Sequence, residues 1–155
     1  MALYRHVANK ADLLDGIVEF LLTEFPSPLA GPWADRLAGL ADAIRASAQR
    51  HPTVFPLLLQ RPVTTPRARR ARDGVYSALK EAGVEESRIP QTERLISTAI
   101  LGFATSEAAG RFRNHSPRQL DADFAVLQEL LGQFIESESR ISSEGYPAPE
   151  EPSAP

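Results

Sequence analysis

The thirteen prolines of this chain constrain its fold more than any other feature. They fall in groups between segments in which apolar residues recur every three or four positions, which is the spacing of a helix that buries one face. Proline begins or ends helices but is poorly tolerated inside them. Strand-like alternation of apolar and polar residues is nearly absent, so the pattern predicts an all-α chain.

Helical segments are expected between these proline groups. Gly83 suits the left-handed residue that ends the fourth segment. From Ser139 onward the chain is rich in Ser, Glu, Gly and Pro, which predicts a disordered tail over residues 139–155. The expected helices are residues 10–25, 33–50, 53–60, 67–82, 91–114 and 120–137.

Composition excludes several classes of function. The net charge of −3 gives no overall basic field for nucleic acid, and no apolar run approaches the roughly 20 residues that cross a membrane. Cysteine is absent, and His6, His51 and His115 lack the helical spacing of a metal pair. No nucleophile elbow or phosphate-binding loop is present. We therefore expect a cytoplasmic protein that is not an enzyme and has no cofactor, metal or membrane partner.

Two amphipathic patterns meet at a tight joint near the N-terminus. Leu3, Tyr4 and Val7 share one side of a short helix. Asn9 then offers a side-chain N-cap, and Asp12 follows three positions later, close to the spacing of a capping box. The joint therefore predicts a short helix, a sharp turn and a longer helix.

This joint resembles the end of the recognition helix and the start of the next helix in the TetR family of bacterial transcriptional regulators. Val7 stands where Phe is commoner, and the other positions of the pattern agree. The joint reads Leu3-Tyr4-Arg5-His6-Val7-Ala8-Asn9-Lys10-Ala11-Asp12-Leu13-Leu14. Three pairs in the family's order extend the resemblance to about residues 2–135, namely His51-Pro52, Arg61-Pro62 and Thr65-Pro66.

The resemblance implies a TetR-type transcriptional regulator, acting as a repressor, with three parts. Residues 1–25 would be a remnant of the helix-turn-helix DNA-binding domain. Residues 33–138 would form a ligand-binding and dimerisation domain, and residues 139–155 the tail. A helical dimerisation or partner-binding module without DNA function is the alternative. The nucleotide sequence upstream of the first codon, read in frame, discriminates the two, because only the regulator needs two further helices there.

The same resemblance assigns DNA contacts to Tyr4, His6 and Lys10, which match phosphate-contacting positions of the family. Such contacts position a protein on DNA but do not read its sequence. In the family two helices and a turn precede the joint, whereas only Met1 precedes it here. We therefore expect a truncated DNA-binding domain, with operator DNA as a partner only if those helices are present.

A small-molecule site inside the helical body is also implied by the resemblance. Glu107 would offer a polar contact there, or lie exposed at the edge of its apolar row. Leu57 stands where the tetracycline-sensing branch has a metal-binding His, so a tetracycline–magnesium site is not implied. We expect a small hydrophobic ligand. Its large contacts, each of which could equally be plain core, are Phe55, Leu58, Tyr76, Ile100 and Phe103.

A homodimer built as a four-helix bundle is the last implication. Small residues recur at four-residue spacing in the expected helix 91–114, and the helix 120–137 is apolar on more than one face. An intramolecular contact could use the same small residues. The expected interface residues are Gly102, Ser106, Gly110, Leu127, Leu131 and Phe134.

We predict that the 155-residue chain alone does not bind DNA with sequence specificity. An isolated helix of about eight residues is marginal in water, so contacts from Tyr4, His6 and Lys10 should be weak and salt-sensitive. Fluorescence anisotropy with random operator pools measures this. Tight, selective retention of one sequence would contradict the prediction.

Overall fold

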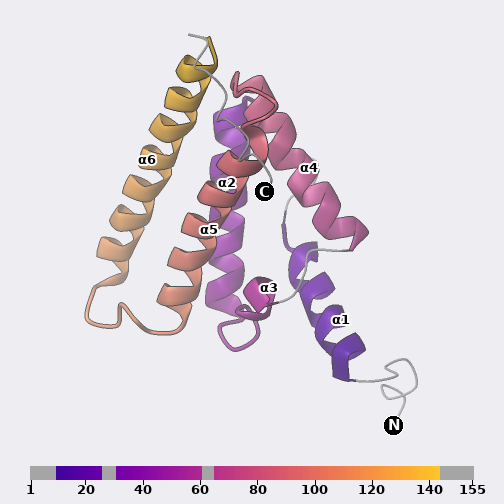
Figure 1. The fold of residues 1–155 in the computed structure, drawn as a ribbon. Coiled ribbons are helices and arrows are strands. Elements are labelled where there is room, and N and C mark those ends of the chain that lie inside the picture. The colour runs from indigo at the N-terminus through magenta and orange to yellow at the C-terminus, as the bar shows by residue number, and fades with distance from the viewer. Residues whose placement is uncertain (1–9, 26–30, 61–64, 144–155) are drawn as a thin grey trace, which may run out of the picture.

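The computed structural model describes residues 10–25, 31–60 and 65–143, which form α-helices and no strand (Figure 1). The predicted all-α fold is confirmed. The helices are α1 (Lys10–Thr23), α2 (Trp33–Arg50), α3 (Leu57–Gln60), α4 (Pro66–Glu81), α5 (Ile89–Ala108) and α6 (Pro117–Ser143).

The helices α2 and α5 run side by side through the centre of the body (Figure 1). Both contact α6 on one side and α4 on the other. Toward the end opposite the α4–α5 connection, α1 contacts α3 and α4. The central pair therefore determines where the outer helices can pack.

Apolar side chains from four helices form the main core. Leu79 of α4, Ile96 of α5 and Ile135 of α6 are buried in one cluster, and Trp33 and Leu37 of α2 pack against it. Full burial of each branched or aromatic side chain stabilises a fold by roughly 1.5–3 kcal/mol. These contacts hold α2, α4, α5 and α6 together.

The first helix is tied to the body at two places. Val18 and Leu22 of α1 share a buried cluster with Ala68 of α4. Just beyond α1, Glu24 receives a hydrogen bond from Arg50 at 2.9 Å and pairs with His51 Nε2 at 3.0 Å. The hydrogen bond from Arg50 is the largest cause that lowers the pKa of Glu24 to about 2. The C-terminal ends of α1 and α2 are therefore joined.

Local sequence explains where α4 begins and ends. The Thr65 side chain accepts a hydrogen bond from the Ala68 N–H at 3.3 Å, and Pro66 follows as the first helical residue. After the helix, Gly83 has φ +90° and the Val84 N–H bonds to the Leu79 carbonyl oxygen at 3.1 Å. The predicted left-handed stop at Gly83 is confirmed.

The structure corrects the end of α5, which was expected at Asn114 and lies at Ala108. Gly110 has φ +74°, and the Arg111 N–H bonds to the Ser106 carbonyl oxygen at 3.0 Å, as in helices that close with a left-handed glycine. Gly110 therefore terminates the helix, and its expected place in a helical stripe with Gly102 and Ser106 is wrong.

The last helix is longer than expected, so predicted disorder from Ser139 is wrong for residues 139–143. Buried Glu138 accepts hydrogen bonds of 2.8 and 3.0 Å from Arg88. The Ser142 hydroxyl accepts one from the Glu85 N–H at 3.0 Å. These contacts fix the end of α6 to the segment before α5. Residues 144–155 lie outside the described part of the chain.

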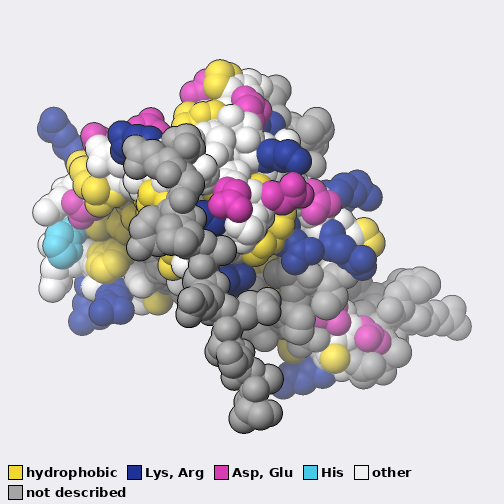
Figure 2. All heavy atoms as spheres, turned by 45° about the horizontal axis from the view of Figure 1, so that its top comes forward, with side chains coloured by type: hydrophobic (Ala, Val, Ile, Leu, Met, Phe, Trp, Pro, Cys, Tyr) yellow, Lys and Arg dark blue, Asp and Glu magenta, His cyan; other side chains and the backbone are white. Residues whose placement is uncertain are grey.

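The surface carries both signs of charge. Figure 2 shows Lys and Arg interspersed with Asp and Glu among apolar side chains, without one continuous basic field on this face. No helix in the described ranges is long and apolar enough to cross a membrane.

Candidate ligand cavity

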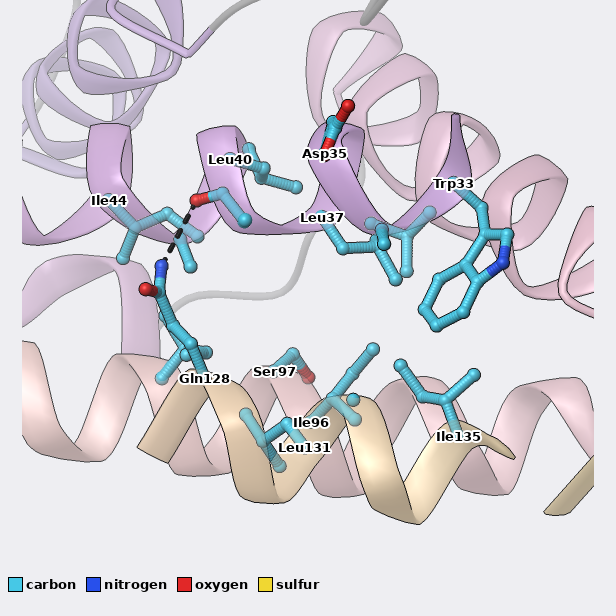
Figure 3. A pocket seen from close by; sticks show the side chains of 16 residues that line it. Trp33, Asp35, Leu37, Leu40, Ile44, Ile96, Ser97, Gln128, Leu131 and Ile135 are labelled. Carbon is cyan, nitrogen blue, oxygen red and sulfur yellow. Dashed lines mark hydrogen bonds between the residues drawn. The ribbon is translucent and has the colours of Figure 1, made fainter. Parts of the chain in front are cut away.

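A cavity of about 280 Å³ lies between α2, α5 and α6, with Val75 contributed by α4 (Figure 3). Small residues line part of it, with Ala34, Ala38 and Ala41 on α2 and Gly132 on α6. Its aliphatic lining consists of Leu37, Leu40, Ile44, Val75, Ile96, Ile100, Leu131 and Ile135.

The helical period of α2 builds one wall of this cavity. Trp33, Leu37, Leu40 and Ile44 recur at three- and four-residue spacing, and all four side chains line the same space (Figure 3). Large side chains at these positions alternate with the alanines, so the wall has hollows. In Figure 3 the six-membered ring of Trp33 closes one end of the row.

Few polar groups reach the lining. Gln128 Nε2 donates to the Ala38 carbonyl oxygen at 3.2 Å and to Asp42 Oδ1 at 3.0 Å. Ser97 Oγ donates to the Arg94 carbonyl oxygen at 3.3 Å. The third polar lining residue, Asp35, is exposed and points away from the apolar side chains in Figure 3. The cavity is therefore mainly an apolar chamber.

A charged cluster fixes the same three helices near one end of the cavity. Arg45 of α2 donates two hydrogen bonds to Glu107 of α5, at 2.6 and 2.7 Å, and pairs with Asp121 of α6 at 2.9 Å. Its guanidinium also lies over the Phe124 ring, 4.9 Å from the centroid. The hydrogen bonds with Glu107 are the largest cause that raises the pKa of Arg45.

Glu107 therefore has a structural partner, which neither alternative for this residue anticipated. Its side chain is 10% exposed and both carboxylate oxygens are engaged by Arg45, with Gln49 Nε2 adding a bond at 3.1 Å. Because a bidentate pair orients both groups, Glu107 holds α5 against α2. It does not line the cavity described above.

Of the other residues expected to contact a ligand, Ile100 lines this cavity. Phe55 is fully buried against Ala48 and Ala104, and Leu58 packs against the same cluster. Tyr76 packs on the main core, and the centroid of the Phe103 ring lies 5.2 Å from that of the Phe124 ring. The structure thus brings Ile100 to the chamber and places these four elsewhere in the body.

The expected dimer residues do not share one exposed surface. Gly102 is exposed on α5, while Leu127 and Phe134 pack against the core clusters. Leu131 lines the cavity, and Ser106 is half-buried. The apolar side chains that are at least half exposed on α5 and α6 are instead Leu95, Val126 and Leu130.

The N-terminal positions can be placed only in part. Lys10 is exposed at the first residue of α1, which suits a residue that meets a phosphate. Tyr4 and His6 lie outside the described residues.

Sequence reasoning missed most of the α2 wall. The spacing of Trp33, Leu37, Leu40 and Ile44 predicted a buried helix face, but a core and a chamber require the same pattern. The additional signal was the interleaved Ala34, Ala38 and Ala41, which leave space between the larger side chains.

Comparison with known proteins agrees with this architecture. The family profile for the tetracyclin repressor-like C-terminal domain matches residues 25–144. The solved structure of apo ActR from Streptomyces coelicolor superposes with a TM-score of 0.71 at 18% identity, covering 88% of this chain and 80% of that one. The structure of ActR, a TetR family protein, in complex with actinorhodin superposes with a TM-score of 0.71 at 19% identity and with the same coverage. No curated protein matches the chain significantly.

The family match covers more than half of the chain, whereas the likeness to ActR at this identity shows a shared fold. The chain therefore belongs to the TetR family of transcriptional regulators and carries its tetracyclin repressor-like C-terminal domain.

Proposed function

We propose that this chain is the effector-sensing and dimerisation body of a TetR-type repressor, and that it binds a small apolar molecule between α2, α5 and α6. The apolar chamber of about 280 Å³ carries this proposal. Ligand sites are typically concave and apolar with a few placed polar groups, and this chamber has that character. The complex of ActR with actinorhodin adds support, because a related fold accommodates a small molecule.

The position of α2 suggests how occupancy would reach the N-terminal part. This helix lines the chamber through Trp33, Leu37 and Ile44, and its last residue, Arg50, donates a hydrogen bond to Glu24 beyond α1. A ligand that displaces α2 would therefore displace the attachment of α1. In the TetR-type arrangement α1 follows the recognition helix, so this route would change the affinity for operator DNA.

The proposal predicts that small apolar compounds stabilise the chain. A ligand at about 100 times its Kd raises the free energy of unfolding by about 2.7 kcal/mol, which a thermal-shift screen detects. Replacing cavity-lining Ala38 by Leu should reduce the shift, because the larger side chain occupies the chamber. Ala11→Leu, at an exposed position on α1, is the matched control. If no compound of any class stabilises the chain, the effector-sensing role is contradicted and the partner-binding alternative is favoured.

We further propose a homodimer in which α5 and α6 of two subunits meet. Leu95, Val126 and Leu130 are 50%, 54% and 56% exposed on these helices. Gly102 lies exposed on α5, and no atom of a neighbouring element lies within 4 Å of the place its Cβ would occupy. Val126 and Leu130 are four residues apart and share one face of α6, and exposed apolar patches commonly mark an interface. Small residues let helices approach closely within a bundle.

Leu130→Glu should shift the chain from dimer to monomer in sedimentation velocity experiments at micromolar concentration. The substitution would bury an unpaired charge, which costs several kcal/mol in a dimer interface. Leu59→Glu is the matched control, because Leu59 is 51% exposed on α3, away from the proposed interface. A monomeric unmodified chain, or a dimer that survives Leu130→Glu, would contradict the proposed interface.

A further inference from the structure

Gly132 is an unusual residue at its position in α6. A glycine inside a helix makes the helix less stable than an alanine would, because glycine loses more conformational freedom on folding. Close packing does not explain the glycine, because no atom of another helix lies within 4 Å of the place a Cβ would occupy. Its conformation does not require glycine either, since its φ is not positive. The same open space surrounds four other helical glycines, Gly16, Gly39, Gly74 and Gly102, so a further property must distinguish Gly132 from them.

The chamber supplies that property. Gly132 lines it, together with Gln128 four residues earlier and Ile135 three residues later, so these positions share one face of α6. A side chain at residue 132 would project into the space between these neighbours. The missing side chain therefore adds directly to the volume available to a ligand.

The lining of the chamber also disfavours a charged ligand. Among the described residues that form the chamber there is no Lys, Arg or His, and the acidic Asp35 points away (Figure 3). Both hydrogens of the Gln128 amide are engaged by Ala38 and Asp42, which accept and cannot donate at those atoms. A carboxylate or phosphate would lose its hydration without gaining a cation.

The volume sets a size for the occupant. An apolar cavity of about 150 Å³ holds one benzene molecule, so each non-hydrogen atom needs about 25 Å³. On this scale the chamber of about 280 Å³ has room for about 11 non-hydrogen atoms. This is the size of n-decanol or of a two-ring aromatic compound.

We infer that the chamber encloses an uncharged, apolar molecule of this size and that Gly132 sets the upper limit of what it can enclose. The inference rests on the proposed effector-sensing function and adds the class of ligand and the residue that determines its bulk. Replacing Gly132 by Leu places four carbons in the chamber, which leaves room for about seven non-hydrogen atoms. The limit should then fall from n-decanol to n-hexanol.

Titration calorimetry of the full chain with n-hexanol, n-octanol and n-decanol tests this. The unmodified chain should bind n-decanol most tightly, and decanoate at least about 100-fold more weakly because of its charge. Gly132→Leu should weaken the binding of n-decanol by more than about 100-fold, since each excluded methylene lowers the affinity about fourfold. The affinity for n-hexanol should change by less than about threefold.

Gly132→Ala serves as a second variant that should fold at least as stably as the unmodified chain, with n-decanol weakened about fourfold. Gly39→Ala is the matched control, because Gly39 is an exposed helical glycine outside the chamber with nothing within 4 Å of its Cβ position. It should leave all three affinities unchanged.

Equal n-decanol affinity in the unmodified chain and both Gly132 variants would overturn the role of Gly132. Decanoate that binds as tightly as n-decanol would overturn the uncharged class. A chain that binds no alkanol, yet is stabilised by other compounds, would overturn the inference and leave the effector-sensing function standing. Only the absence of stabilisation by every class of compound contradicts that function itself.

Discussion

The packing of α2 against α5 is the contact on which the rest of the molecule depends. Small buried residues lie along it, with Ala48 of α2 and Ala104 of α5 in the same cluster. Arg45 and Glu107 then fix the two helices in one relative position through a bidentate ion pair. Since α4 and α6 each contact both helices, their places follow from this pairing.

The ion pair between Arg45 and Glu107 fixes the relative position of α2 and α5 more than it raises the net stability of the fold. Arg45 and Glu107 are 12% and 10% exposed, and the desolvation cost of burying two charges offsets much of their attraction. Removing Arg45 would leave the buried Glu107 carboxylate without its cationic partner, so the two must stay together. The cluster therefore acts as a fixed point for three helices, next to a chamber that contains little but apolar surface.

Much of the fold could be predicted from sequence, because its signals are local. The proline groups and the spacing of apolar residues identified the helices, and Gly83 ended α4 as expected. The errors arose where distant contacts decide the outcome. Ser139 to Ser143 read as tail because their composition is polar, but Arg88 and Glu85 hold that end of α6 in place.

The cavity was harder to predict for a related reason. Periodicity shows which side chains face inward, but it does not show whether the space between them is filled. Phe55 and Phe103 were natural candidates by size, and they pack against other side chains in the body. The chamber instead forms where residues are small, at Ala38, Ala41 and Gly132. Whether a small residue leaves an open space depends on the side chains of the facing helix, which the sequence of one helix does not show.

Trp33 allows a direct measurement of the central claim that the chamber between α2, α5 and α6 is the effector site. It is the only tryptophan of the chain and lines the chamber, so its fluorescence reports on that space. Titration with n-decanol should change the emission of Trp33 saturably, with the same Kd as calorimetry gives. Binding detected by calorimetry without any change in Trp33 emission would place the ligand elsewhere and contradict the account.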